Sequence, residues 1–397
     1  MASFVAHPSE EKVLADVLTG LRGQVLPSSS TPTSTGVAAN SQRRTCKIKL
    51  EDSGLAGTLP PSLGDLECLE ELRLSANGLQ GTIPTSISRL QALRILDLSC
   101  NQMTGPASQV FALVNLEELV LTENQFEGNL LCEEVKALNK LTRLDIVGNA
   151  FDGEISPSFH SLCKLEYLHI ARNRFTSRSN GFQILDFPTS MSSLIEIDMS
   201  SNKLQGIIPK SISSLRHLQI LDLSENQFHG DIPESMKSLT QLMTLNLSTN
   251  NFHGELFPQV GQLPDLVDLS LSQNALSGVI PESIGELRNL RSLDLSKNHF
   301  SGRIPYSFTN LSNLVALQLS DNELSGPLPP GFGRMSSLEE LDLHRCALVL
   351  DSSHLHYPLL AIVWRDPSTR LWRSHRLKRS TYLETAFKVP SRHPSAI

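Results

Sequence analysis

Residues 314–329 read Leu314-Val-Ala-Leu317-Gln-Leu319-Ser-Asp-Asn322-Glu-Leu324-Ser-Gly326-Pro-Leu-Pro329, and this stretch is the clearest copy of a unit that recurs along most of the chain. The most regular member of the unit is an asparagine, present at Asn77, Asn101, Asn124, Asn149, Asn173, Asn202, Asn226, Asn250, Asn274, Asn298 and Asn322. Nine of the ten intervals are 23 to 25 residues long, and the interval from Asn173 to Asn202 is 29. A period in this range predicts a solenoid, in which each repeat contacts only its neighbours.

The positions around each asparagine have separate physical roles. Upstream lies L-x-x-L-x-L, whose period-two alternation predicts a short strand with its leucines directed inward. The second residue after the asparagine is apolar and is phenylalanine at positions 126, 151, 175, 228, 252 and 300, so we expect one internal row of rings. The fourth residue after the repeat asparagine, or after Ser53 in the same register, is glycine in eleven units, which favours a backbone bend at that point.

The asparagines themselves are expected to pair buried peptide groups. A strand that turns sharply leaves such groups without ladder partners, and a carboxamide can both donate to a carbonyl and accept from an N–H of a neighbouring turn. Ser53 and Cys346 occupy the same register, giving thirteen units of about 24 residues from Thr45 to Leu348. The fold class predicted is an α/β solenoid, curved and right-handed, with a parallel β-sheet on its concave face and a length of about 60 Å.

The pattern L-x-x-L-x-L-x-x-N-x-L-x-G-x-I-P, nearly complete in residues 314–329, resembles the plant-type leucine-rich repeat. That repeat is found in ectodomains of plant receptor-like kinases, in receptor-like proteins and in polygalacturonase-inhibitor-like proteins. The resemblance covers about three quarters of the chain. It implies recognition of a peptide or protein ligand outside the cell or at the plasma membrane, with a co-receptor kinase as a further candidate partner.

The two ends of the chain depart from that family pattern. Residues 1–44 are expected to form a degenerate cap, with an amphipathic helix over Glu10–Leu21 and a Ser/Thr/Pro linker, and no signal peptide is readable there. The solenoid spans 45–348. Residues 349–397 form a basic, non-repeat tail expected to be disordered, whose longest apolar run, Leu359–Trp364, is too short for a transmembrane segment. Our hypothesis for these ends is a truncated or alternatively spliced receptor-like product, and a cytoplasmic location is the alternative.

Cysteines and glycosylation sequons bear on the compartment. The six cysteines do not sort into close pairs, which favours isolated thiols over a disulfide framework. Two N-x-S sequons occur, at Asn246 and at Asn310. Asn310 is expected in a turn before a strand and Asn246 within a strand on the concave face, so Asn310 is the preferred glycosylation site of the two.

The longest repeat supplies the candidate ligand-binding residues. A per-repeat insertion maps to a loop and often serves binding, and this unit replaces the usual Gly-x-I-P stretch by Arg174–Gly181. The same unit is expected to present Tyr167, His169 and Arg172 on the strand face, beside Glu196 and Asp198 of the next turn. An aromatic ring, an imidazole and a guanidinium in one patch suit a ligand anchor. The alternative is a slightly long loop with ordinary surface residues.

Charge on the expected concave face is predominantly negative. The two outward columns of the strands hold eleven acidic residues against four basic ones, Lys47, Lys49, Arg73 and Arg143. Such a face favours a basic or polar partner through long-range attraction. The alternative is that the charge serves solubility, because Leu-Asp-Leu-Ser is part of the plant-type consensus.

No catalytic arrangement is present in this pattern. The sequence contains neither the signatures of a protein kinase nor paired catalytic carboxylates in a pocket, so we expect no enzyme activity, no cofactor and no metal site. Nucleic acid is not an expected partner. We interpret the chain as a non-catalytic recognition protein of receptor-like signalling or defence; the alternatives are a secreted polygalacturonase-inhibitor-like protein and a cytosolic leucine-rich-repeat scaffold.

Overall fold

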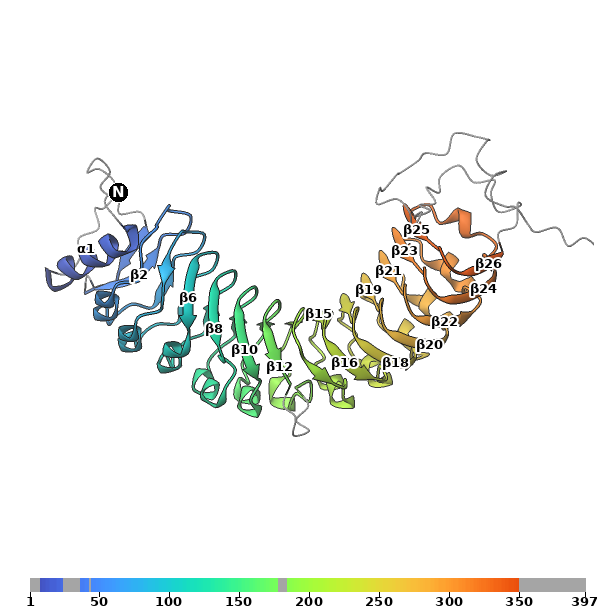
Figure 1. Cartoon of the computed structure of the whole chain (residues 1–397), viewed down its shortest axis with the longest axis horizontal. Helices are drawn as coiled ribbons and strands as arrows, with labels where there is room; N and C mark the ends of the chain where they lie inside the picture. The colour runs from blue at the N-terminus through green and yellow to red at the C-terminus, as the bar shows by residue number, and fades with distance from the viewer. Residues whose placement is uncertain (1–7, 24–35, 43, 178–183, 350–397) are drawn as a thin grey trace, which may run out of the picture.

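The computed structural model describes residues 8–23, 36–42, 44–177 and 184–349 of this 397-residue chain. The repeats stack into a curved α/β solenoid with α1 (Pro8–Arg22) at one end and the last repeats at the other (Figure 1). This architecture confirms the predicted fold class. Parts of the expected cap, linker and long loop, and the tail after Val349, lie outside the described residues.

A 14-stranded sheet runs the length of the solenoid. Its first strand is antiparallel to the second, which the sequence did not indicate, and all later strands are parallel in chain order. Equivalent residues pair from repeat to repeat, as Leu221 does with Leu245. The strands are β1 (Val37–Ala39), β2 (Thr45–Lys49), β3 (Glu71–Arg73), β5 (Ile95–Asp97), β7 (Glu118–Val120), β9 (Arg143–Asp145), β11 (Tyr167–His169), β13 (Glu196–Asp198), β15 (Ile220–Asp222), β17 (Thr244–Asn246), β19 (Asp268–Ser270), β21 (Ser292–Asp294), β23 (Ala316–Gln318) and β25 (Glu340–Asp342).

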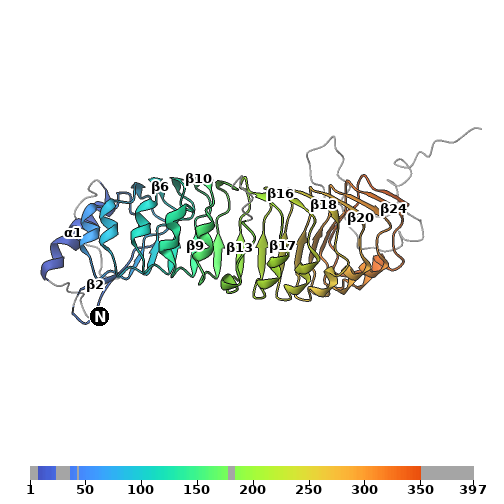
Figure 2. The same ribbon diagram turned by 90° about the horizontal axis from the view of Figure 1, so that it is seen from below.

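A second set of strands follows the asparagines and lines one flank (Figure 2). These strands form one sheet of five and one of seven, again parallel, and the sequence pattern did not predict them. They are β4 (Gln80–Gly81), β6 (Gln102–Pro106), β8 (Gln125–Gly128), β10 (Ala150–Glu154), β12 (Arg174–Thr176), β14 (Gln205–Gly206), β16 (Gln227–Gly230), β18 (Asn251–Glu255), β20 (Ala275–Val279), β22 (His299–Gly302), β24 (Glu323–Pro327) and β26 (Ala347–Val349). The break between the two sheets coincides with the long repeat.

Short 3-10 helices on the outer side of the arc return the chain to the main sheet (Figure 1). A proline often precedes them, and its carbonyl accepts the first helical hydrogen bond, as from Ile87 N–H to Pro84 O at 3.1 Å. They are η2 (Pro61–Asp65), η3 (Thr85–Arg89), η4 (Ser108–Ala112), η5 (Glu133–Leu138), η6 (Pro157–Ser161), η7 (Thr189–Met191), η8 (Lys210–Ser214), η9 (Glu234–Ser238), η10 (Val260–Gln262), η11 (Glu282–Glu286), η12 (Tyr306–Asn310) and η13 (Phe332–Arg334).

The asparagine side chains form the expected internal ladder, of which Asn250 is representative. Its amide nitrogen donates to the Leu223 carbonyl of the preceding repeat at 2.9 Å and to the Leu247 carbonyl of its own repeat at 3.2 Å. Its carbonyl oxygen accepts from the Phe228 N–H at 2.9 Å. At the last repeat, Cys346 directs its Sγ to the Leu319 carbonyl at 3.2 Å, in the same register. Each ladder side chain therefore ties its own turn to the preceding one.

The residue before each ladder position adopts a left-handed backbone conformation. Twelve of these residues are not glycine, with φ between 47° and 55°, among them the β-branched Thr249. A side chain in this region costs about 1–3 kcal/mol when the surrounding structure imposes it. The Thr249 N–H donates to Ser272 O at 2.8 Å and the Asn250 N–H to Gln273 O at 3.2 Å, so the bend directs two successive amides to the next repeat.

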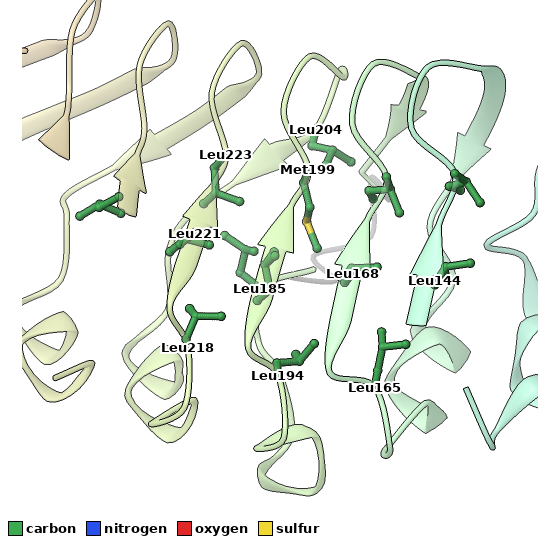
Figure 3. Close-up of a cluster of buried hydrophobic side chains, with 14 of the residues drawn as sticks. Leu144, Leu165, Leu168, Leu185, Leu194, Met199, Leu204, Leu218, Leu221 and Leu223 are labelled. Atoms are coloured by element: carbon green, nitrogen blue, oxygen red, sulfur yellow. The ribbon is translucent and has the colours of Figure 1, made fainter. Parts of the chain in front are cut away.

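Leucines pack in the interior between the sheets and the 3-10 helices (Figure 3), and phenylalanines belong to the same core. Phe126, Phe151 and Phe175 are fully buried, and their stacked rings have centroids 6.1 and 6.3 Å apart. Phe228 and Phe252 continue the row beyond the long repeat, at 6.5 Å. The predicted internal row of rings is confirmed. Burial of each such side chain contributes about 1.5–3 kcal/mol, but only when a neighbouring repeat covers it.

Helix α1 closes the N-terminal end of this core and contains the predicted amphipathic segment. Val17 and Leu21 are fully buried on the helix face that packs against the first repeat. Glu10, which is 2% exposed, accepts a hydrogen bond from the Thr45 N–H at 2.7 Å and pairs with Arg44. Burial acts to raise the pKa of Glu10, but these bonds outweigh it and the pKa is lowered. The helix therefore anchors the first parallel strand, β2.

Replacing Asn250 by alanine is expected to lower the free energy of unfolding by about 3 kcal/mol. The substitution leaves the buried Phe228 N–H without a partner, which costs about 1–3 kcal/mol, and removes the Asn250 hydrogen bonds to the Leu223 and Leu247 carbonyls, each worth about 1 kcal/mol. Urea denaturation followed by circular dichroism measures the change. Asn251→Ala is the matched control, because the neighbouring Asn251 is exposed. Equal unfolding midpoints for the two variants would contradict the ladder's structural role.

Candidate ligand-binding surface

The concave surface consists of the outward residues of the main sheet. In β11 the middle residue, Leu168, is buried, whereas Tyr167 and His169 are half-buried and face outward. The neighbouring β13 repeats the pattern around Ile197, so that Tyr167 pairs in register with Glu196 and His169 with Asp198. Four of the five sequence-predicted ligand-binding residues are therefore adjacent on one face.

His169 is held between two carboxylates from the strands on either side. Its Nε2 lies 3.0 Å from Glu196 Oε2, and its Nδ1 lies 3.4 Å from Asp145 Oδ2. Asp145 also accepts from Arg143 at 2.8 Å and from the Thr122 hydroxyl. No sequence motif indicates Thr122, because its contact with Asp145 depends on the register of neighbouring repeats.

Tyr167 adds an aromatic surface to this charged group. The guanidinium carbon of Arg143 lies 5.7 Å from the centre of its ring, within the range of a cation–π contact. The His169 ring lies 6.5 Å from it in an edge-to-face arrangement. We define Tyr167, His169, Glu196 and Asp198, with Asp145 and Arg143, as the β11 patch.

The electrostatics of the β11 patch favour a protonated imidazole. Burial acts to lower the pKa of His169, but the hydrogen bond and charge of Asp145, with the charge of Glu196, raise it overall. Burial acts to raise the pKa of Asp145, and the hydrogen bonds from His169, Thr122 and Arg143 lower it well below its usual range. The pair is thus a charge-assisted contact on the concave face.

Arg172 lies outside the strand, contrary to the expectation that it shares the strand face. It is the residue before Asn173, with φ of 53°, in the turn after β11. Its side chain is exposed and donates to Glu123 at 2.6 Å, two repeats away. Arg172 therefore belongs to the rim of the surface. Of the long-loop segment Arg174–Gly181, residues 178–181 lie outside the described chain.

A second cluster, which the repeat pattern does not predict as a ligand-binding site, surrounds Glu71 at the N-terminal end of the concave face. Lys47, Lys49 and Arg73 contact its carboxylate at 3.2, 2.8 and 2.7 Å. Burial of Glu71 acts to raise its pKa, but the hydrogen bonds from the three basic groups lower it to about 2. Arg73 also contacts Asp97 at 3.7 Å and Glu118 at 3.1 Å, and with these two carboxylates the three basic and three acidic side chains balance.

The two sequon asparagines lie on opposite surfaces. Asn310 is exposed at the end of η12, on the outer side. Asn246 lies in β17 on the concave face, where its amide nitrogen donates to Asp222 Oδ2 at 3.0 Å. Glycosylation of either residue stays a prediction, and the nitrogen of Asn246 that would carry the sugar is already hydrogen-bonded.

Other site classes find little support in the part of the chain that the structure describes. No group of three or more His, Cys, Asp or Glu side chains there is arranged to hold a metal ion. All six cysteines are free thiols. Nor does any described helix have the length and apolar character needed to cross a membrane.

Comparison with protein families identifies the repeats. Residues 250–356 match the family described as Leucine-rich repeat region, residues 67–126 and 185–228 match Leucine rich repeat, and residues 140–162 match a further Leucine Rich Repeat family. The chain is 36% identical to Receptor-like protein 39 of Arabidopsis thaliana over 105 residues, which are 26% of this chain and 11% of that protein.

Solved structures of plant receptors share the fold. The ectodomain of the Arabidopsis thaliana receptor kinase GASSHO1/SCHENGEN3, in complex with CASPARIAN STRIP INTEGRITY FACTOR 2, aligns with a TM-score of 0.66 and 32% identity over 77% of this chain and 39% of that one. The Arabidopsis receptor kinase HAESA, in complex with the peptide hormone IDA and the co-receptor SERK1, aligns with a TM-score of 0.61 and 28% identity over 84% of this chain and 68% of that one.

The ladder, the repeat register and these matches define a leucine-rich-repeat protein. Within that class, its repeats are similar to those of plant receptor-like proteins and receptor kinase ectodomains, and the chain spans only part of the length of these relatives. The resemblance read from the sequence motif is thereby confirmed.

Stability is expected to depend on pH through His169. Because the folded-state pKa is raised, the contribution of this histidine is fully present below the unfolded-state pKa of about 6.5 and is lost as pH rises through the folded-state value. The native protein should therefore have a higher free energy of unfolding than the His169→Gln variant. This difference, measured by urea denaturation, should be larger at pH 6 than at pH 8.5. The same comparison with His217→Gln, at an exposed position, serves as the control. A pH-independent difference for His169→Gln would contradict this assignment.

Proposed function

We propose that this chain is a non-catalytic recognition protein that binds a peptide or protein partner on the concave face of its leucine-rich repeats, in receptor-like signalling or defence. The observation that carries the proposal is the β11 patch. It combines an aromatic ring, an imidazole and carboxylates on three adjacent strands whose backbones the asparagine ladder holds in register. Side chains held in this way lose little conformational freedom on binding.

The relatives support the same conclusion. Two similar solved structures are complexes with a peptide hormone or a factor, and one of them also contains a co-receptor. We propose by analogy that a peptide contacts the β11 patch and the rim at Arg172, and that a co-receptor kinase is a further partner. On this proposal residues 45–348 are the recognition domain, flanked by 1–44 and 349–397, and the domain lies outside the cell.

Selection of binders from a phage-displayed library of random 12-residue peptides tests the proposal. Peptides selected on the native chain should bind Tyr167→Ala at least tenfold more weakly, because a buried aromatic anchor typically contributes that much to affinity. Tyr306→Ala is the matched control, since Tyr306 is 54% exposed on the outer surface, at the start of η12. Equal loss in both variants, or no loss in either, would argue against recognition through the β11 patch.

A further inference from the structure

Charge on the concave face changes character at β13. From β2 to β11 the outward acids have basic neighbours: Glu71 contacts three basic side chains, Arg73 contacts Asp97 at 3.7 Å and Glu118 at 3.1 Å, and Arg143 contacts Asp145. From β13 to β25 the outward strand residues include no Lys, Arg or His. The first half of the face is internally neutralised, whereas the second half is not.

Between β13 and β21 the outward carboxylates without a basic partner are Asp198, Asp222, Asp268 and Asp294. Among the described residues, none of these four forms an ion pair. In Asp198, Asp222 and Asp294, Oδ1 accepts from the N–H and hydroxyl of the serine two residues later, as from Ser296 at 3.0 and 2.7 Å. The Oδ2 atoms of Asp198 and Asp294 receive no hydrogen bond from the part of the chain that is described. These oxygens remain available to a ligand.

Two of these carboxylates lie directly beside each other. Asp198 and Asp222 pair in register on neighbouring strands. Burial raises the pKa of Asp222, and the charge of Asp198 raises it further. A cation placed between them relieves this repulsion, and none is supplied by the described residues.

Apolar side chains follow the edge of the same half. The residue before each strand from β13 onward is apolar in four of seven repeats, and the column reads Ile195, Gln219, Met243, Val267, Arg291, Val315 and Glu339. Met243 is 45% exposed. An apolar edge beside a row of carboxylates is complementary to a ligand that is both cationic and partly apolar. A simple metal or ammonium ion has no apolar part and does not meet this description.

We propose that the concave surface of β13–β21 binds an extended cationic peptide that runs across the strands, with one basic side chain at Asp198 and Asp222 and a second at Asp294. This inference rests on the proposed function and names the class of its ligand. On this proposal the acidic residues of the concave face contact the ligand, and their role is not limited to the solubility that the repeat consensus would explain.

The strand spacing sets the spacing of the basic residues. Asp222 and Asp294 occupy equivalent positions on β15 and β21, three strand steps apart through β17 and β19. At about 4.8 Å per step the two carboxylates are about 14 Å apart, and an extended peptide covers that distance in about four residues. Residues i and i+4 also lie on the same face of an extended chain. The basic side chains are therefore expected at i and i+4.

Neutral hydrogen-bonding groups separate the two anchors. Asn246 and Ser270 occupy the same column on β17 and β19, and both are half-buried. Their amide and hydroxyl groups can form hydrogen bonds with the backbone of a peptide that crosses β17 and β19. A glycan on Asn246 would cover this segment, so the proposal requires Asn246 to be unmodified.

The test uses fluorescein-labelled 12-residue peptides of alanine and serine in fluorescence anisotropy with the full chain. The first carries arginine at positions 4 and 8, the second arginine at positions 4 and 5, and the third glutamate at positions 4 and 8. The first should bind most tightly, and more weakly at 300 mM than at 50 mM NaCl. Asp222→Asn and Asp294→Asn, which are nearly isosteric, should each weaken its binding about fivefold. Asp97→Asn, in the neutralised half, should leave it unchanged.

Each outcome decides the inference. Equal binding of the arginine and glutamate peptides, equal affinity in Asp222→Asn, Asp294→Asn and the native chain, or a glycan on Asn246 would overturn it. Library-selected peptides that depend on Tyr167 but lack a basic pair would also overturn it, while the proposed function would stand. Failure to select any concave-face peptide from the library would remove both.

Discussion

The hydrogen bonds of the repeat asparagines are the interaction on which the rest of the structure depends. A main-sheet strand of three residues turns into a left-handed bend and then into a flank strand, and this path leaves buried peptide groups unpaired in every repeat. One carboxamide joins carbonyls of two successive turns and accepts an N–H between them, as Asn250 does. The bend can therefore be sharp without a cost in unpaired groups. Even the longest repeat keeps the arrangement, because Asn202 still reaches the Ile170 carbonyl at 3.0 Å.

Because the asparagine ladder and the apolar core hold the backbone in place, the outward side chains are not needed for folding and can differ between repeats. The inward leucines are fixed by packing, so variation between repeats falls on the outward columns of the main sheet. The first half of the concave face uses this freedom for ion pairs between repeats, around Glu71 and around His169. In the second half, Asp198, Asp222 and Asp294 have no basic partner among the described residues and accept hydrogen bonds only from serines and Asn246. The two halves differ in chemistry although they share one backbone, and we infer recognition from that difference.

The structural features that depend on a single repeat, or on the constant interval between repeats, could be predicted from the sequence. The phenylalanine row, the ladder and the parallel sheet each follow from residues at a constant interval. The flank strands were missed because each is only two to five residues long, as in Gln227–Gly230, and pairs only once its neighbour is in place. Arg172 was misplaced although its position directly before Asn173 was readable, since the left-handed bend there was not anticipated. The contacts of His169 with Asp145 and Glu196 depend on side-chain reach across repeats, which spacing alone does not give.

Hydrogen–deuterium exchange of the chain with and without a selected peptide tests the central claim most directly, because it reports on both faces of every repeat at once. The account predicts slowed exchange in segments containing β11 to β21 of the main sheet, with the 3-10 helices η8 to η11 on the outer side unchanged. Slowed exchange confined to the outer helices or to the flank strands β14 to β22 would contradict recognition on the concave face.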